Sequence, residues 1–174
     1  MSRAFVFLDR DGTLIEDRGY AFQLADYAPL AGAYDAVRAL RGAGFGTAIV
    51  TNQSGIARGY FDEADFARFQ AHLLADFAAH GAALDATYHC PHLPDAGCEC
   101  RKPRPGLLLR AQREFGAELA RSWVIGDKES DVGLARAAGC AAVLLAPPGA
   151  PRADGVTLAP DVLAGALLVL AEPR

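Results

Sequence analysis

Two aspartates, Asp9 and Asp11, follow a short apolar run and are the strongest chemical feature of this chain of 174 residues. The run, Ala4-Phe5-Val6-Phe7-Leu8, has the composition of a buried strand. If the extended geometry continues for one more step, both carboxylates point the same way from the carboxyl end of that strand. Adjacent acids repel each other unless a cation lies between them, and Mg²⁺ binds carboxylate oxygens together with water and phosphate oxygens. The pair therefore predicts a metal-assisted phosphate site, with an ordinary turn as the alternative.

Three further polar segments adjoin predicted strands or helices. Thr51-Asn52-Gln53-Ser54-Gly55 follows an apolar run and offers a hydroxyl, amides and backbone N–H groups that could cradle phosphate oxygens. Arg101-Lys102-Pro103 precedes a predicted helix, and Gly126-Asp127-Lys128-Glu129-Ser130-Asp131 follows another apolar run. Only two of the 17 basic residues are lysines, Lys102 and Lys128, which favours a phosphate site too narrow for a guanidinium.

One loop gathers three cysteines and a histidine in the pattern Cys-x-His-x₅-Cys-x-Cys. These residues are Cys90, His92, Cys98 and Cys100. Three thiolates and one imidazole match a tetrahedral structural Zn²⁺ site, and four protein ligands leave no open position for catalysis. Reduced thiols without a metal are the alternative, and His89 could compete with His92 as the fourth ligand. Zinc would brace the loop that leads directly into Lys102, whereas Cys140, among Ala and Val, is expected to be a buried apolar residue.

Short apolar runs alternate with segments of helical period, which predicts an α/β fold with a mainly parallel sheet in a single domain over 1–174. The predicted strands cover 4–8, 46–50, 86–90, 122–125 and 141–145. The predicted helices cover 32–43, 62–80, 105–115, 130–138 and 162–170, with Asp62 and Asp161 as N-caps of the second and last. The segment 146–151 is expected to be a surface loop after the last strand.

Composition excludes several functional classes. Apolar residues make up 52% of the chain and the formal net charge is −4, with no block of like charges. A basic face for nucleic acid or a membrane surface is therefore not expected, and neither is a membrane span. A cytoplasmic monomer that acts on a small molecule is the prediction.

Four motifs, taken in chain order, closely resemble those of the haloacid dehalogenase (HAD) superfamily of phosphohydrolases. They are Asp9-x-Asp11-Gly12-Thr13, Thr51, Lys102 and Gly126-Asp127-x₃-Asp131. The resemblance implies a Rossmann-like three-layer α/β/α sandwich. The predicted elements already fill the chain between Asp9, Thr51 and Lys102, so we expect no cap domain.

The same resemblance implies a role for each motif residue. Asp9 would be the nucleophile that forms an aspartyl phosphate, and Asp11 would protonate the leaving oxygen and then activate water. Thr51 and Lys102 would hold the phosphoryl group. Asp9, the backbone carbonyl of Asp11 and Asp127 would bind Mg²⁺.

Within the superfamily, the zinc loop and the runs 51–59 and 100–106 are similar to those of the heptose 1,7-bisphosphate phosphatases. That similarity implies a small phosphorylated sugar as substrate, cleaved at its C7 phosphate in nucleotide-activated heptose biosynthesis. It implies substrate contacts from Asp17, Arg18, Gly19, Tyr20, Asn52, Gln53, Ser54, Arg101 and Lys128.

Two alternatives stay open. Histidinol-phosphate phosphatases share the short spacing between His92 and Cys98, although Ser54 and the run Ile56-Ala57-Arg58-Gly59 favour the sugar enzymes. A non-catalytic, zinc-braced interaction domain is the reading from a different class. No residue favours it, because every proposed catalytic position holds a competent residue type.

Overall fold

The computed structural model describes residues 2–151 and 155–172, whose strands form one six-stranded sheet. The strands are β1 (Phe5–Leu8), β2 (Gly46–Asn52), β3 (Ala86–Cys90), β4 (Trp123–Gly126), β5 (Ala141–Leu145) and β6 (Thr157–Ala159). All neighbours pair in parallel, in the order β3-β2-β1-β4-β5-β6. The expectation that the sheet ends at residue 145 is wrong, because β6 pairs with β5. Three residues are too few for a periodic pattern to indicate a strand.

Five α-helices connect or follow the strands of the described residues. They are α1 (Ala33–Gly42), α2 (Glu63–Ala79), α3 (Gly106–Phe115), α4 (Glu129–Ala138) and α5 (Val162–Ala171), and two short 3-10 helices cover Leu24–Asp26 (η1) and Leu119–Arg121 (η2). The Asp62 side chain accepts a hydrogen bond from the Asp65 amide, and the Asp161 side chain accepts one from the Ala164 amide. Both predicted N-caps are thus present.

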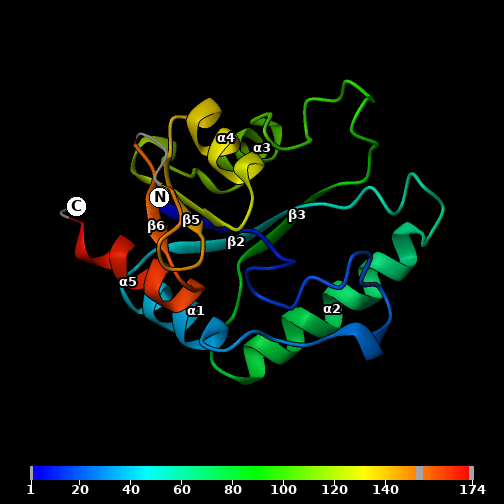
Figure 1. Cartoon of the computed structure of the whole chain (residues 1–174), viewed down its shortest axis with the longest axis horizontal. Helices are drawn as coiled ribbons and strands as arrows, with labels where there is room; N and C mark the ends of the chain where they lie inside the picture. The colour runs from blue at the N-terminus through cyan, green and yellow to red at the C-terminus, as the bar shows by residue number, and fades with distance from the viewer. Residues whose placement is uncertain (1, 152–154, 173–174) are drawn as a thin grey trace.

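Helices cover both faces of the sheet, which gives three layers (Figure 1). Alternate residues of β1 pack against the helices on opposite faces of the sheet. Val6 and Leu8 pack with α1, α2 and α5, whereas Phe5 and Phe7 pack with α3 and α4. A strand buried on both faces is apolar throughout, as the sequence of β1 is. None of the helices in the described ranges is both long and apolar enough to cross a membrane.

The strand order of the sheet reverses at β1, a central strand. The chain runs outward from β1 through β2 to β3 and then returns to the other side of β1 with β4. In open α/β sheets this reversal leaves a crevice at the carboxyl ends of the strands, where ligands bind. The connection from β1 to α1, residues 9–32, contains η1 as its one named element. It therefore supplies a flap, residues 17–28, and not a cap domain.

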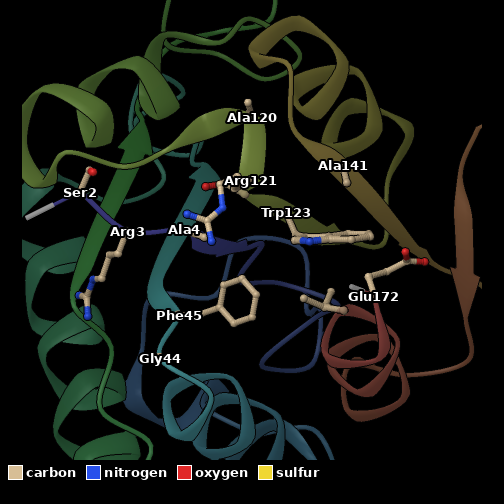
Figure 2. A pocket seen from close by; sticks show the side chains of 12 residues that line it. Ser2, Arg3, Ala4, Gly44, Phe45, Ala120, Arg121, Trp123, Ala141 and Glu172 are labelled. Carbon is tan, nitrogen blue, oxygen red and sulfur yellow. The ribbon is translucent and has the colours of Figure 1, made fainter. Parts of the chain in front are cut away.

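A pocket of about 380 Å³ lies at the opposite, amino ends of the strands (Figure 2). Its lining includes Arg3, Phe45, Arg121, Trp123 and Glu172. None of the sequence-predicted site residues lines this pocket. The candidate chemistry is confined to the carboxyl ends of the strands.

Candidate active site

The turn after β1 sets the direction of the two motif aspartates. The Asp9 amide donates to the Ile125 carbonyl (3.0 Å), and the Arg10 carbonyl accepts from the Leu14 (3.0 Å) and Ile15 (3.1 Å) amides. The chain therefore bends at Arg10, and extended geometry does not continue to Asp11. The Asp11 carboxylate lies against the side chain of Arg10, and it is not part of the acidic cluster that contains Asp9.

That cluster brings together three carboxylates and a lysine from distant parts of the chain. Ligand oxygens of Asp9, Asp127 and Asp131 all lie within 4.8 Å of one another. The Lys102 ammonium is buried and donates to Asp9 Oδ1 (2.8 Å), Asp131 Oδ1 (2.7 Å) and the Val50 carbonyl (3.0 Å). The motif resemblance implies no separate role for Asp131, although this residue closes the fourth motif. Its place here is to orient Lys102.

The charges in this cluster perturb one another strongly. Burial and then the charge of Asp9 raise the pKa of Asp127 to about 6, and the same two causes raise the pKa of Asp131 to about 6. Burial opposes the charge on Lys102, but the charges of Asp9 and Asp131 outweigh it and raise its pKa. The carboxylates therefore carry more negative charge than one ammonium offsets.

The donor set fits a hard divalent cation. Asp127 Oδ1 is buried and has no hydrogen-bond partner among the described residues. A buried carboxylate oxygen without a donor is costly, and a cation bound between Asp127 and Asp9 would satisfy it and relieve the repulsion. The oxygen-only chemistry of these side chains suits Mg²⁺, as the sequence predicts.

Thr51 and Gln53 connect the end of β2 to Asp11. The Gln53 amide donates to Thr51 Oγ1 (2.8 Å) and to Asp11 Oδ2 (2.9 Å). Thr51, Gln53 and Lys102 are all buried. The structure thus places the four predicted catalytic residues together at the carboxyl ends of β1 and β2. The Gln53 amide is bonded to Asp11 and Thr51 within the protein, so it is not a free donor to substrate.

Asn52 also has an internal role. Its side chain accepts from the Lys102 amide (3.1 Å) and donates to the Lys102 carbonyl (3.3 Å). This pair of bonds fixes the peptide that carries the ammonium, so Asn52 holds Lys102 in register with β2. Ser54 accepts from the Arg58 amide (3.0 Å) through its carbonyl, inside the turn that follows β2.

The flap carries four of the predicted substrate contacts. Asp17 Oδ2 accepts from the Lys128 ammonium (3.1 Å), a contact that joins the flap to the loop after β4. The Gly19 amide donates to Asp17 Oδ1 (2.9 Å), and Tyr20, 42% exposed, packs edge-on against Tyr60. Arg18 is turned to Glu16 on the surface.

The predicted zinc ligands Cys90, His92, Cys98 and Cys100 lie together, with ligand atoms within 4.8 Å of one another. Cys90 Sγ lies 3.6 Å from Cys98 Sγ and 3.5 Å from His92 Nδ1, which is 3.2 Å from Cys100 Sγ. A tetrahedral site with Zn–S bonds of 2.3 Å has S···S edges of about 3.8 Å, so these ligands are already close to their places. His89 does not compete: its Nε2 lies 2.9 Å from Glu63 Oε2, and its ring packs against Phe66.

Arg101 joins the zinc loop to the active-site lysine. Its guanidinium donates to the His92 carbonyl (3.2 Å), and the next residue is Lys102. The predicted zinc ligands and the predicted phosphate-binding Lys102 therefore belong to one continuous segment.

Gly12 must be a glycine for the carboxylate cluster to form. Its φ is +84°, and a Cβ there would lie 2.3 Å from Asp127 Oδ2. We expect Gly12→Ala to displace the Asp127 carboxylate, to lower kcat/KM about 100-fold and to raise the Mg²⁺ concentration needed for half-maximal rate. Phosphate release measured over a Mg²⁺ series checks both.

Gly139, at the end of α4, is the matched control for this substitution. Its φ is +73°, and a Cβ there would meet nothing within 4 Å. Gly139→Ala carries a similar backbone strain of about 1–2 kcal/mol without disturbing a carboxylate. Equal activity losses in the two variants would show that strain, and not the contact with Asp127, limits Gly12→Ala.

The fold and the carboxylate site define a phosphohydrolase of the HAD type, and comparison with known proteins agrees. The HAD-hydrolase-like family matches residues 99–166. The D-glycero-beta-D-manno-heptose-1,7-bisphosphate 7-phosphatase of Yersinia pestis is 42% identical over 91% of this chain and 88% of its own. The D-glycero-alpha-D-manno-heptose-1,7-bisphosphate 7-phosphatase of Burkholderia mallei is 39% identical over 83% of this chain and 80% of its own.

A solved structure gives the same result. The D,D-heptose 1,7-bisphosphate phosphatase of B. bronchiseptica, complexed with magnesium and phosphate, superposes with a TM-score of 0.86 at 34% identity, covering 98% of this chain and 100% of its own. This chain belongs to the family of the D-glycero-D-manno-heptose-1,7-bisphosphate 7-phosphatases within the HAD hydrolases.

Proposed function

We propose that this protein hydrolyses D-glycero-D-manno-heptose 1,7-bisphosphate at the C7 phosphate. The observation that carries the proposal is the cluster of buried Asp9, Lys102 and Asp131 with half-buried Asp127, at the point where the strand order of the sheet reverses. Such a set holds an anionic phosphoryl group and a divalent cation together, as phosphoryl transfer requires. The relatives named for this reaction supply the substrate class.

The first half-reaction uses Asp9 and Asp11. An Asp9 carboxylate oxygen attacks phosphorus, the bond between phosphorus and the C7 oxygen breaks, and the proton of a neutral Asp11 carboxyl passes to that oxygen. Lys102 and the hydroxyl of Thr51 hold the phosphoryl oxygens while charge shifts toward the leaving group. The products are the sugar alcohol and a phosphoryl group on Asp9.

The second half-reaction restores the starting protonation states. Asp11, now ionised, accepts a proton from water as the water oxygen attacks phosphorus. The bond between phosphorus and Asp9 breaks, which releases inorganic phosphate and leaves Asp9 as a carboxylate and Asp11 as a neutral carboxyl.

Two metals belong to the proposal. Asp9, Asp127 and the backbone carbonyl of Asp11 would hold Mg²⁺, which supplies positive charge to the phosphoryl oxygens. The four ligands of the zinc loop would hold a structural Zn²⁺ that keeps Lys102 in place. The contacts from the flap, Arg101 and Lys128 to the sugar and its second phosphate stay predictions, as does the monomeric state.

Phosphate release with Mg²⁺ tests the proposal. The alpha and beta anomers of the heptose bisphosphate and histidinol phosphate are compared in parallel. We expect a kcat/KM at least about 100-fold higher for one of the heptose anomers than for histidinol phosphate, because only the sugar carries a second phosphate for Arg101 and Lys128. Equal or higher kcat/KM with histidinol phosphate would refute the substrate and leave the carboxylate chemistry intact.

A further inference from the structure

Arg10, the residue between the two motif aspartates, is a buried cation that the mechanism above does not use. Its side chain is 1% exposed, although no anion outside its own motif pairs with it among residues 2–151 and 155–172. The guanidinium donates to Asp11 through Nε to Oδ2 (3.0 Å) and through Nη2 to Oδ1 (3.0 Å). Two parallel charge-assisted hydrogen bonds fix the orientation of a carboxylate more closely than a single bond does.

The donors around Asp11 leave little of its carboxylate free. A carboxylate has about four lone-pair sites on its two oxygens. Arg10 occupies one on each oxygen, and Gln53 occupies the second on Oδ2 (2.9 Å). One site on Oδ1 is left, so this arrangement allows a proton to enter or leave at a single place.

Arg10 also reaches the flap. Its Nη2 donates to the Ala21 carbonyl (3.2 Å), one residue beyond Tyr20. Its guanidinium also lies over two rings of α2, with Cζ 4.8 Å from the centroid of Phe69 and 5.8 Å from that of Phe66. The flap, the acid–base carboxylate and α2 thus meet at one side chain.

Packing alone does not account for a charge at this position. Arg10 Nη1 is buried and has no hydrogen-bond partner among the described residues. An apolar side chain over Phe66 and Phe69 would avoid that cost, because buried ion pairs contribute little net stability compared with apolar groups. A role in the reaction is the better explanation.

We propose that Arg10 is a positioning residue for the reaction: it fixes the Asp11 carboxylate so that only one site on Oδ1 is open to proton transfer, and it ties that orientation to the flap through Ala21. The proposal rests on the proposed function of Asp11 as the acid and base. It concerns orientation, and it assigns Arg10 no contact with substrate.

Arg10→Lys tests this inference, because lysine keeps the charge and removes the two-pronged hold. With heptose bisphosphate we expect kcat to fall about 100-fold and KM to change less than about threefold. With p-nitrophenyl phosphate, whose phenolate leaves without needing a proton, the first half-reaction is spared and the second is slowed. A burst of about one equivalent of p-nitrophenol, followed by slow turnover, is the expected signature.

Three outcomes overturn the inference. One is a kcat within about threefold of the parent. Another is a loss with p-nitrophenyl phosphate that has no burst, which indicates general damage to the site. The third is an equal loss of kcat with heptose bisphosphate, or the same burst, in Phe69→Leu, which disturbs the packing below Arg10 and keeps its bonds to Asp11.

Two further variants keep the test decisive. Asp11→Asn separates the two proposals: if it retains full activity, the acid–base role of Asp11 fails, whereas an inactive Asp11→Asn with an unaffected Arg10→Lys refutes only the role of Arg10. If Arg10→Lys does not fold, Arg10→Gln removes the buried charge and the two-bond hold on Asp11 while it keeps an amide donor. The absence of a burst in Arg10→Gln then counts against the inference.

Discussion

Asp9→Asn is expected to lower kcat by about 10⁴-fold or more while the chain stays folded. An amide has no anionic oxygen to attack phosphorus, so the covalent half-reaction stops. The Asn side chain keeps a carbonyl oxygen that can accept from the Lys102 ammonium, which donates to Asp9 Oδ1 in the parent (2.8 Å). One negative charge also leaves a crowded cluster, so the midpoint of thermal unfolding without Mg²⁺ should fall by no more than about 4 °C.

Phosphate release and a thermal melt of the same preparation check this expectation. Asp35→Asn is the matched control, since Asp35 is an exposed aspartate on α1 that pairs with Arg38. It makes the same chemical change away from the site and should keep the parent rate. A residual rate in Asp9→Asn close to that of the parent would remove Asp9 from the mechanism.

Cys98→Ser is expected to lose the zinc ion, to lower kcat/KM about 100-fold and to lower the unfolding midpoint by roughly 10 °C. The loop from 91 to 101 is mostly exposed, with little apolar packing to hold it in place. The Arg104 guanidinium donates to the Cys98 carbonyl (2.9 Å), so its position also depends on the folded loop. Without the metal, the segment that carries Lys102 is no longer held in a fixed position.

Metal analysis, phosphate release and thermal unfolding measure the three effects together. Cys140→Ser is the control, because Cys140 lies outside the loop and is not a member of the Cys/His cluster. It should keep about one zinc per chain and the parent activity. Parent protein with much less than one zinc per chain, or a Cys98→Ser variant that retains its zinc, would contradict the structural role of the loop.

Much of the fold could be predicted because periodicity and caps are local properties. The helix predicted over 62–80 forms and buries one apolar stripe, Phe66, Phe69, Leu73 and Phe77. Five of the six strands fall where short apolar runs lie. β6 could not be found, because Thr157–Ala159 gains its strand geometry from pairing with β5, a tertiary contact that no local pattern encodes.

The candidate site was predicted in its parts but not in its connections. The motifs in chain order predict that Asp9, Thr51, Lys102 and Asp127 lie together at the carboxyl ends of the strands. They could not indicate that Asn52 fixes the Lys102 peptide, or that the chain bends at Arg10 and turns the Asp11 carboxylate toward it. The first depends on hydrogen bonds between a side chain and the backbone and the second on a bend and a bond between two side chains, and the geometry of both depends on the folded sheet.

The central place of β1 has a consequence for how this chain folds during synthesis. Val6 pairs with Thr47 on one side and with Trp123 on the other. The edge of β1 that pairs with β4 therefore stays unpaired until most of the chain has left the ribosome. An unpaired apolar edge is a template for pairing with other chains. We expect nascent chains that stop before β4 to aggregate, and refolding from denaturant to be slow and sensitive to concentration, because the decisive contacts are distant in sequence.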